Sequence, residues 1–144
     1  MTAVGSQQPD IVLWGIRIQE PVTTLTDLLV SAVCYYSFYR LQQSGKRDAV
    51  FSLFNYYFLT MGLATTFGGL IGHAFLYYFG FKWKLSGWFI SMLSVSLLER
   101  ATIMHARPLL KPRIGNFLSL LNIVELLILS GITVFTMNLP ARRQ

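Results

Sequence analysis

The sequence predicts an all-α fold, a polytopic membrane protein built as a bundle of four transmembrane helices. Its 144 residues are 53% hydrophobic and only 12% charged, with a mean hydropathy of +0.51, whereas soluble domains carry about 25% charged residues. Over the stretch 49–81 the chain holds no charged residue apart from the mostly neutral His73. So long an apolar run is unfavourable in water and is typical of a segment that crosses a lipid bilayer.

Tyrosine pairs near both ends of this run are typical of the aromatic belts of a membrane protein. Tyr56 and Tyr57 precede Tyr77 and Tyr78 by 21 residues. A helix rises roughly 1.5 Å per residue, so the two pairs lie about 31 Å apart. This separation matches the hydrocarbon thickness of a bilayer, at whose edges tyrosine is enriched.

Windows of about 20 apolar residues define four membrane spans, and together these make the chain one transmembrane domain over 1–144. Helices are expected because a chain in lipid must satisfy its own backbone hydrogen bonds, and no alternating segments typical of a barrel are present. Prolines at 21, 108, 112 and 140 suit the ends of these helices. The expected elements are an interfacial tail over 1–20, spans near 22–41, 50–79, 85–104 and 114–137, and a basic tail over 138–144.

Two of these elements differ in length from a simple span. The run 11–18 is too short to cross a bilayer, so we expect it at the interface with Trp14 as an anchor. No cleavable signal pattern precedes it, and the first span therefore serves as the insertion signal. The segment 50–79 is longer than the hydrocarbon requires, which indicates one tilted or protruding helix.

Basic residues set the expected orientation and the expected partners. With four spans both termini lie on one side, and the first and third loops carry seven Lys or Arg against five on the side of the termini. The positive-inside rule places both termini outside, and we expect a bacterial inner membrane. The net charge of +6 is spread over loops rather than one patch. It predicts membrane lipids as partners, with anionic headgroups at the basic loops, and no nucleic acid.

Small and polar residues form a seam along the first two spans. Asp27 and Ser31 share a helix face with Thr24 and Cys34, and His73 shares one with Gly62, Thr66 and Gly69. The two helices are antiparallel, so Asp27 and His73 reach comparable depth and are expected to hydrogen-bond. Close helix packing alone is an alternative explanation of the small residues, including the spacing of Gly68 and Gly72.

The last two spans carry further carboxylates. Glu125 lies near the middle of its span, where a charge costs about 2.5–3.5 kcal/mol on insertion scales. With Asn122 it forms either a structural interhelical hydrogen bond or a site for a ligand, ion or proton. Glu99 lies nearer the inner rim, where we expect it and its neighbour Arg100 to be a pair of side chains that snorkel to the interface. The candidate polar residues are thus Asp27, Ser31, His73, Asn122 and Glu125.

Two segments of the first half, Glu20-Pro-Val-Thr-Thr-Leu-Thr-Asp27 and Gly68-Gly-Leu-Ile-Gly-His73, resemble polar motifs of the membrane hydrolase superfamily of alkaline ceramidases and progestin/adipoQ receptors. In its overall sequence character the chain is similar to small uncharacterised bacterial integral-membrane proteins related to that superfamily. The resemblance covers about residues 20–73 and implies zinc, with His73 as a metal ligand, Asp27 orienting a metal-bound water and Ser31 as a polar neighbour. That superfamily has seven helices and a later histidine pair, both of which are missing here.

Three functions compete at this point. The leading hypothesis is a non-catalytic accessory subunit or lipid-binding scaffold, because small-residue seams explain most of the pattern. The second is a metal-dependent hydrolase of lipid amides or esters that uses Asp27 and His73. The third is a component of proton- or cation-coupled transport through Asp27, His73 and Glu125, which requires a homo-oligomer or a larger membrane complex because four helices enclose little space.

Overall fold

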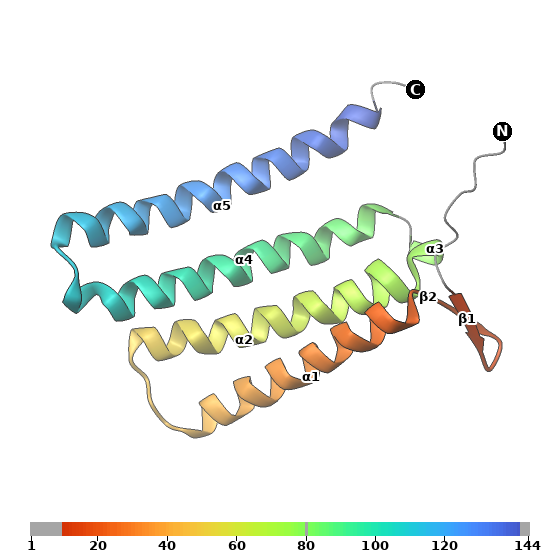
Figure 1. The fold of residues 1–144 in the computed structure, drawn as a ribbon, viewed down its shortest axis with the longest axis horizontal. Helices are drawn as coiled ribbons and strands as arrows, with labels where there is room; N and C mark the ends of the chain where they lie inside the picture. Colours follow the sequence, from red (N-terminus) through yellow and green to blue (C-terminus); the bar gives the residue numbers. More distant parts are fainter. Residues whose placement is uncertain (1–9, 80, 142–144) are drawn as a thin grey trace.

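The computed structural model describes residues 10–79 and 81–141, and helices dominate it (Figure 1). The predicted all-α class is confirmed. Residues 1–9 and 142–144, which belong to the two predicted tails, lie outside the described part. In chain order the elements are β1 (Asp10–Leu13), β2 (Ile16–Gln19), α1 (Pro21–Gln43), α2 (Ala49–Phe67), the π-helix η1 (Gly68–Ala74), α3 (Leu76–Phe79), α4 (Phe81–Ala106), the 3-10 helix η2 (Arg107–Leu109) and α5 (Pro112–Ala141).

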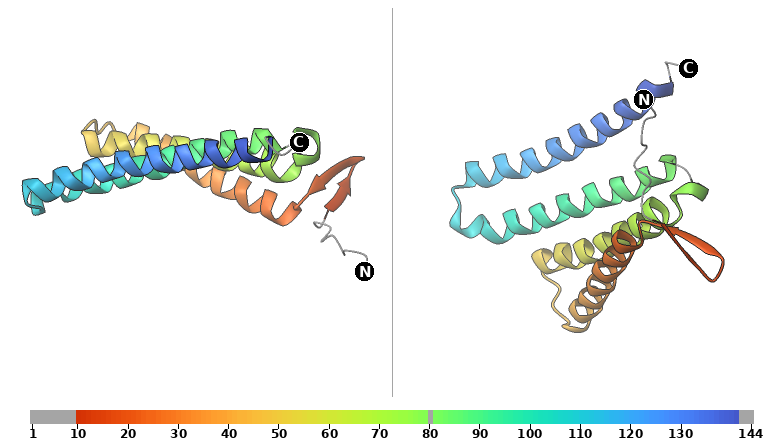
Figure 2. Two further views of the ribbon diagram at one scale, coloured as in Figure 1. Left: turned by 90° about the horizontal axis from the view of Figure 1, so that it is seen from above. Right: turned by 45° about the vertical axis from the view of Figure 1, so that its right-hand side comes forward.

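The four long helices form an open row rather than a closed bundle. They run alternately in opposite directions, and each packs mainly on its neighbour in sequence, α4 on α2 most extensively (Figures 1 and 2). Helices α1 and α5 occupy the two edges. Helix α5 begins close to α4 and separates from it toward its C-terminal end (Figure 1).

The bounds of the helices follow the predicted spans, with two exceptions. Pro21 and Pro112 begin α1 and α5, where the missing N–H of proline has no intrahelical partner in any case. Asp48 caps α2 by accepting a hydrogen bond from the N–H of Phe51 at 2.7 Å. Helix α5, however, continues past Pro140 to Ala141, because the hydrogen bond that this proline removes belongs to a final turn.

The second exception is the segment 50–79, which the sequence predicts as one continuous helix. It is divided into α2, the π-helix η1 and the short helix α3. Helix α2 ends at Phe67 and passes into the π-helix η1, at whose end the N–H of Phe75 bonds to the carbonyl of Leu70 at 2.9 Å. A π-turn accommodates an extra residue in the helix and is frequent at functional sites. The sequence gives no periodic signal for it, because its hydrogen bonds change the spacing only locally.

The predicted interfacial tail before α1 contains a regular element that the sequence did not reveal, because residues 10–19 form an antiparallel hairpin. Asp10 pairs with Gln19 and Ile11 with Ile18. At the turn, Trp14 and Gly15 have φ of 50° and 81°, the left-handed conformation that two-residue hairpin turns require. The indole of Trp14 is 94% exposed at the tip.

Buried residues in the described part are all small or polar. The largest fully buried side chain is that of Ser94, whereas the interior of a water-soluble protein is built from Leu, Ile, Val and Phe. No residue of those four types is buried in the described part of the chain. The buried positions are Thr24, Ser31, Cys34, Gly62, Ala64, Gly69, Gly72, Ala74, Gly87, Ser94, Ala101, Gly115 and Asn122.

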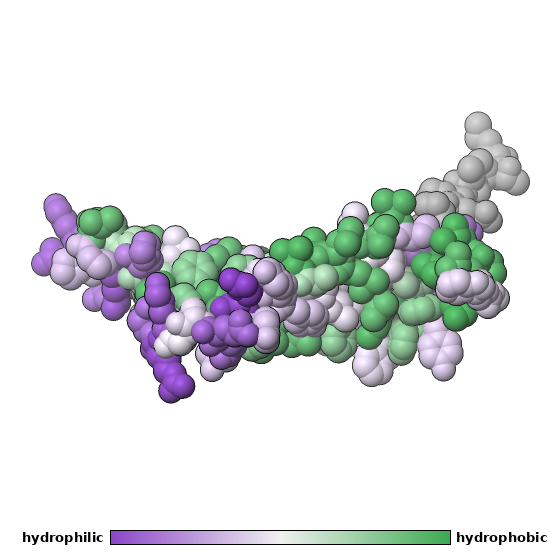
Figure 3. All heavy atoms as spheres, turned by 90° about the horizontal axis from the view of Figure 1, so that it is seen from below, coloured by the Kyte–Doolittle hydropathy of each residue, from purple (hydrophilic) through white to green (hydrophobic). Residues whose placement is uncertain are grey.

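Large apolar side chains instead point outward. On α1 the side chain of Leu29 is 58% exposed, and on α5 that of Phe135 is 68% exposed. Figure 3 shows hydrophilic residues gathered where α1 connects to α2 and α4 to α5, with hydrophobic residues over much of the rest of that face. Within the described residues, length and composition qualify one stretch to cross a membrane, Pro112–Phe135 of α5. This stretch taken alone is weak evidence.

Candidate functional site

Two carboxylates flank the imidazole of His73, which projects from η1. Its Nδ1 lies 2.6 Å from an oxygen of Glu20 and its Nε2 lies 3.8 Å from an oxygen of Asp27. The side chains of His73, Glu20 and Asp27 are 21%, 18% and 28% exposed. The sequence correctly places Asp27 beside His73, but 3.8 Å exceeds hydrogen-bond length. The hydrogen bond is made by Glu20, which sequence reasoning missed as a site residue.

Glu20 reaches the imidazole because the backbone turns sharply between the hairpin and α1. Its φ of 46° and ψ of 57° lie in the left-handed region, which costs a residue with a Cβ about 1–2 kcal/mol. Contacts around the turn offset this cost. Thr24 donates its hydroxyl hydrogen to the carbonyl of Gln19 at 3.3 Å, and the N–H of Tyr77 donates to the side chain of Gln19 at 3.2 Å.

Glycines of η1 let α1 come close enough to place Asp27 beside His73. A Cβ added at Gly69 would lie 3.0 Å from the Cβ of Asp27 and 3.3 Å from the carbonyl oxygen of Thr24. Neither neighbour is the end of a flexible side chain. The close approach of the two helices therefore depends on Gly69 having no side chain.

Asp27 and His73 open into a cavity of about 190 Å³ between α1, α2, η1 and α4. Thr65 and Lys84 also line it. The aliphatic part of Lys84 lies over Gly72, 3.6 Å from where a Cβ would be. The recess thus combines a carboxylate, an imidazole, an ammonium group and a hydroxyl with a lining that is otherwise largely apolar.

Ser31, predicted as a neighbour of this site, instead belongs to the contact between α1 and α2. Its hydroxyl donates to the carbonyl of Gly62 at 3.0 Å and lies 2.6 Å from the hydroxyl of Thr66. The hydroxyl of Tyr35 joins the same group, 3.1 Å from that of Thr66. Ser31 is one helical turn from Asp27, and its side chain serves helix packing.

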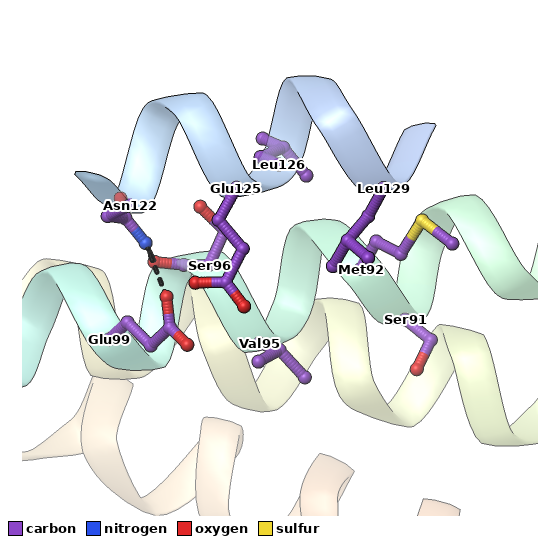
Figure 4. Close-up of a pocket in the computed structure, with 9 residues that line it drawn as sticks. All are labelled: Ser91, Met92, Val95, Ser96, Glu99, Asn122, Glu125, Leu126 and Leu129. Atoms are coloured by element: carbon purple, nitrogen blue, oxygen red, sulfur yellow. Dashed lines mark hydrogen bonds between the residues drawn. The ribbon is translucent and has the colours of Figure 1, made fainter. Parts of the chain in front are cut away.

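Asn122 and Glu125 form a separate polar group between α4 and α5, away from His73. The amide of Asn122 donates to the carbonyl of Ser96 at 3.1 Å and to the carboxylate of Glu99 at 2.8 Å. Glu125 lines the same cavity of about 150 Å³, as Figure 4 shows. Its carboxylate makes no hydrogen bond or ion pair with the residues that the structure describes, so of the predicted pair only the Asn122 side chain joins the two helices.

Glu99 and Arg100, expected as a snorkelling pair at the rim, each have a separate partner within the protein. Glu99 turns toward Asn122, and Arg100 donates to the carbonyl of Ser119 on α5 at 2.9 Å. Consecutive residues on a helix point about 100° apart, which explains why they face different partners. Glu99 is therefore a second polar residue whose role the sequence did not reveal.

Zinc, as implied by the superfamily resemblance, does not fit the residues around His73. Glu20 and Asp27 approach opposite nitrogens of the imidazole, so an ion on either nitrogen would meet one carboxylate rather than two. A catalytic zinc normally has three protein ligands. Among residues 10–79 and 81–141, no group of three or more His, Cys, Asp or Glu is placed to hold a metal ion. The hydrolase and transport hypotheses stay predictions.

Comparison with known proteins gives one match. Residues 22–141 match a family of unknown function (DUF6962). No curated protein and no solved structure matches the chain. The match covers all the long helices and leaves the hairpin outside.

Proposed function

The chain belongs to the DUF6962 family, and we propose that it is an integral membrane protein whose four long helices cross the bilayer and which acts as a non-catalytic lipid-binding scaffold. One observation carries this proposal: the residues buried between the helices are small or polar, and many large apolar side chains face outward. Membrane helices pack in this way, because lipid tails solvate leucine as well as a protein core does.

The free energy of apolar burial supports the same proposal. Leaving a Leu, Ile, Val or Phe exposed to water forgoes about 1.5–3 kcal/mol. In this chain Val33 is 63% exposed, Leu127 is 67% exposed, and many others exceed a third. A soluble monomer with so much exposed apolar surface would be expected to aggregate, whereas acyl chains remove the penalty.

Hydrogen bonds between helices replace the missing apolar core. The contact of Ser31 with the carbonyl of Gly62 joins α1 to α2, and Ser94 donates to the carbonyl of Tyr57 at 3.3 Å to join α2 and α4. Asn122 and Arg100 join α4 to α5. Each such contact in a membrane protein is worth about 0.6 kcal/mol on average, so the fold depends on several of them together with close packing.

Charge distribution supports an orientation. One end of the molecule carries Lys46 and Arg47 between α1 and α2, Arg107 and Lys111 between α4 and α5, and Arg113 in the first turn of α5. The positive-inside rule makes this end cytoplasmic. Both termini and the His73 site then lie at the outer face of a bacterial inner membrane.

Two features favour a scaffold over an enzyme. The imidazole of His73 is bonded to Glu20 and so ties the start of α1 to η1, which is a structural use of both groups. Glu125 lines the cavity between α4 and α5 and is exposed there, and a charge within the bilayer costs about 2.5–3.5 kcal/mol. A neighbouring membrane protein, or a second copy of the chain, beside α5 would remove that cost, as expected of an accessory subunit.

Alkaline washing of membranes tests the location. We expect the full chain to stay in the membrane pellet at high pH, as integral proteins do, and its release into the supernatant would overturn the proposal.

The double substitution Asp27→Asn with His73→Gln tests the role of the site. A scaffold predicts a less stable, less abundant protein, whereas normal abundance with loss of the cellular function would indicate chemistry at His73.

A further inference from the structure

A polar cavity lies at the opposite end of the molecule from His73, where α1 connects to α2. It has a volume of about 210 Å³ and takes its lining from the end of α1, the connecting loop and the first turns of α2. Several water molecules, or one small polar group, fit a space of this size. Its polar lining residues are Gln42, Lys46, Arg47, Ser52, Asn55 and Tyr56.

The two cations of this cavity are not neutralised by the protein. Lys46 and Arg47 form no ion pair with any residue in the described part of the chain. The neighbouring carboxylate, Asp48, accepts the hydrogen bond that caps α2 and lies outside the lining of this cavity. A phosphate group suits two adjacent cations, because each forms charge-assisted hydrogen bonds with its oxygens.

A buried acceptor in the wall of the cavity adds a second requirement. The side-chain oxygen of Asn55 is buried and has no hydrogen-bond partner among the residues that the structure describes. An unpaired buried polar atom is unfavourable. Because Asn55 also lines the cavity, a rotation of its side chain toward the cavity would let a donor of the ligand bond to this oxygen and relieve the penalty. Phosphate at neutral pH offers chiefly acceptors, so a ligand that also carries hydroxyl groups meets this requirement better.

An apolar groove adjoins the polar cavity. It has a volume of about 480 Å³, lies between the start of α2 and the end of α4, and shares Lys46 and Phe51 with the polar cavity. Its lining is mostly apolar, with Val50, Phe54 and Met104 among the apolar residues, and it also includes Asp48 and His105. A ligand with a charged head and an apolar tail therefore has matching surfaces on both sides of Phe51.

We propose that this end of the molecule binds one anionic phospholipid with a polyol headgroup. Its phosphate lies at Lys46 and Arg47, a headgroup hydroxyl is directed toward Asn55, and an acyl chain occupies the groove along Phe54. The inference rests on the proposed function, since only a membrane-spanning arrangement brings this end to the level of the headgroups. It names a lipid class and a site that the general scaffold proposal leaves open.

Lipid retention in bilayers of defined composition tests this site. The full chain is placed in nanodiscs of equal parts phosphatidylglycerol and phosphatidylcholine, released into mild detergent and examined by native mass spectrometry. We expect one retained phosphatidylglycerol per chain. The double variant Lys46→Gln with Arg47→Gln is expected to lower this retention roughly thirtyfold, since each cation near an anionic headgroup contributes about a factor of five.

Matched variants separate this site from bulk charge. Lys111→Gln with Arg113→Gln removes the same charge at the same end, outside the lining of both cavities, and is expected to retain the lipid. Equal loss in this control would overturn the proposal. So would equal retention of phosphatidylcholine by the unchanged chain, or displacement of the lipid by millimolar inorganic phosphate, which would show a site for free phosphate.

The groove has its own variant. Val50→Trp fills it and is expected to lower retention of the lipid about tenfold, while the affinity for soluble glycerol phosphate stays the same. Unchanged lipid retention would contradict the placement of the acyl chain. Alkaline washing of each variant keeps the two proposals apart, because a chain that remains in the membrane pellet yet retains no lipid fails only the second.

Discussion

Helices α1, α2 and α4 form a tightly packed unit, whereas α5 lies beside them on a single neighbour. Together with η1, the three-helix unit contains all the buried glycine and alanine of the described residues except Gly115, and a Cβ at Gly62 or Gly69 would come within 3.0 Å of α1. On α5, a Cβ at Gly131 would meet nothing within 4 Å. Only 11% of the most apolar window of α5 is buried.

The difference shows that the two parts are held by different forces. Backbone proximity and many dispersion contacts hold the three-helix unit, which makes it sensitive to any added atom. A few polar contacts, those of Asn122 and Arg100, hold α5. We therefore expect packing variants to damage the first part most, and hydrogen-bond variants to release the second without unfolding the first.

The largest effect is expected from Gly69→Val. The added Cβ would lie 3.0 Å from that of Asp27 and 3.3 Å from a backbone oxygen, so α1 must move away from η1. Overpacking of this kind costs about 1–3 kcal/mol. The loss of unfolding free energy is measured in detergent, with steric trapping as the readout of unfolding. The control Gly131→Val is expected to change stability by less than about 0.5 kcal/mol, and equal losses at the two positions would erase the contrast between the two parts.

A smaller effect is expected from Asn122→Leu, and it should be confined to α5. The change removes both donors from Ser96 and Glu99, at a cost of about 1–2 kcal/mol. Spin-label distances between α4 and α5 are expected to broaden while those between α1 and α2 stay the same. Thr133→Val is the control, because its hydroxyl bonds within α5, to the carbonyl of Leu129. Broadening between α1 and α2 would show that the parts are coupled.

Glu20→Gln should loosen the start of α1 by about 1–2 kcal/mol, because it weakens a charge-assisted hydrogen bond in a largely buried place. Hydrogen exchange of the hairpin and of the first turn of α1 measures this. The expected result is faster exchange there and no change in α5. Unchanged exchange in the hairpin would mean that His73 does not hold this end together.

The smallest effect is expected from Asp10→Asn, which breaks the ion pair with Arg17. Both side chains are about half exposed, and such pairs contribute about 0–1 kcal/mol. Thermal unfolding should scarcely change. A loss as large as that of Glu20→Gln would show that the hairpin, rather than the His73 contact, fixes the start of α1.

The amino-acid sequence predicted the helices well because apolar runs and prolines mark their extent. It also placed Asp27 near His73, since helical periodicity fixes which side chains share a face. Glu20 was out of reach of that argument, because it precedes α1 in a left-handed conformation that no periodicity describes. The π-helix and the hairpin depend on local hydrogen bonds over a few residues, too short for a periodic pattern to emerge.

Contacts between distant helices were harder to predict still. Glu99 and Asn122 are 23 residues apart, and their meeting depends on how α4 and α5 rotate about their axes. Likewise, the sequence placed Ser31 on the correct face of its helix but wrongly made it part of the polar site around His73. The rise of that helix places it beside Thr66 instead. Depth along a helix and rotation about it are set by packing, which a single sequence does not reveal.

Cysteine accessibility tests the central claim, that the outward apolar face lies in acyl chains, most directly. In a Cys34→Ala background, single cysteines replace Leu29 and Leu127, which are 58% and 67% exposed, and Ser44 in the loop after α1. The protein is labelled in permeabilised membranes with a charged, water-soluble maleimide. We predict rapid labelling at position 44 and none at 29 or 127 until the membrane is dissolved. Equally rapid labelling at all three positions would show that water surrounds these helices and would contradict the account.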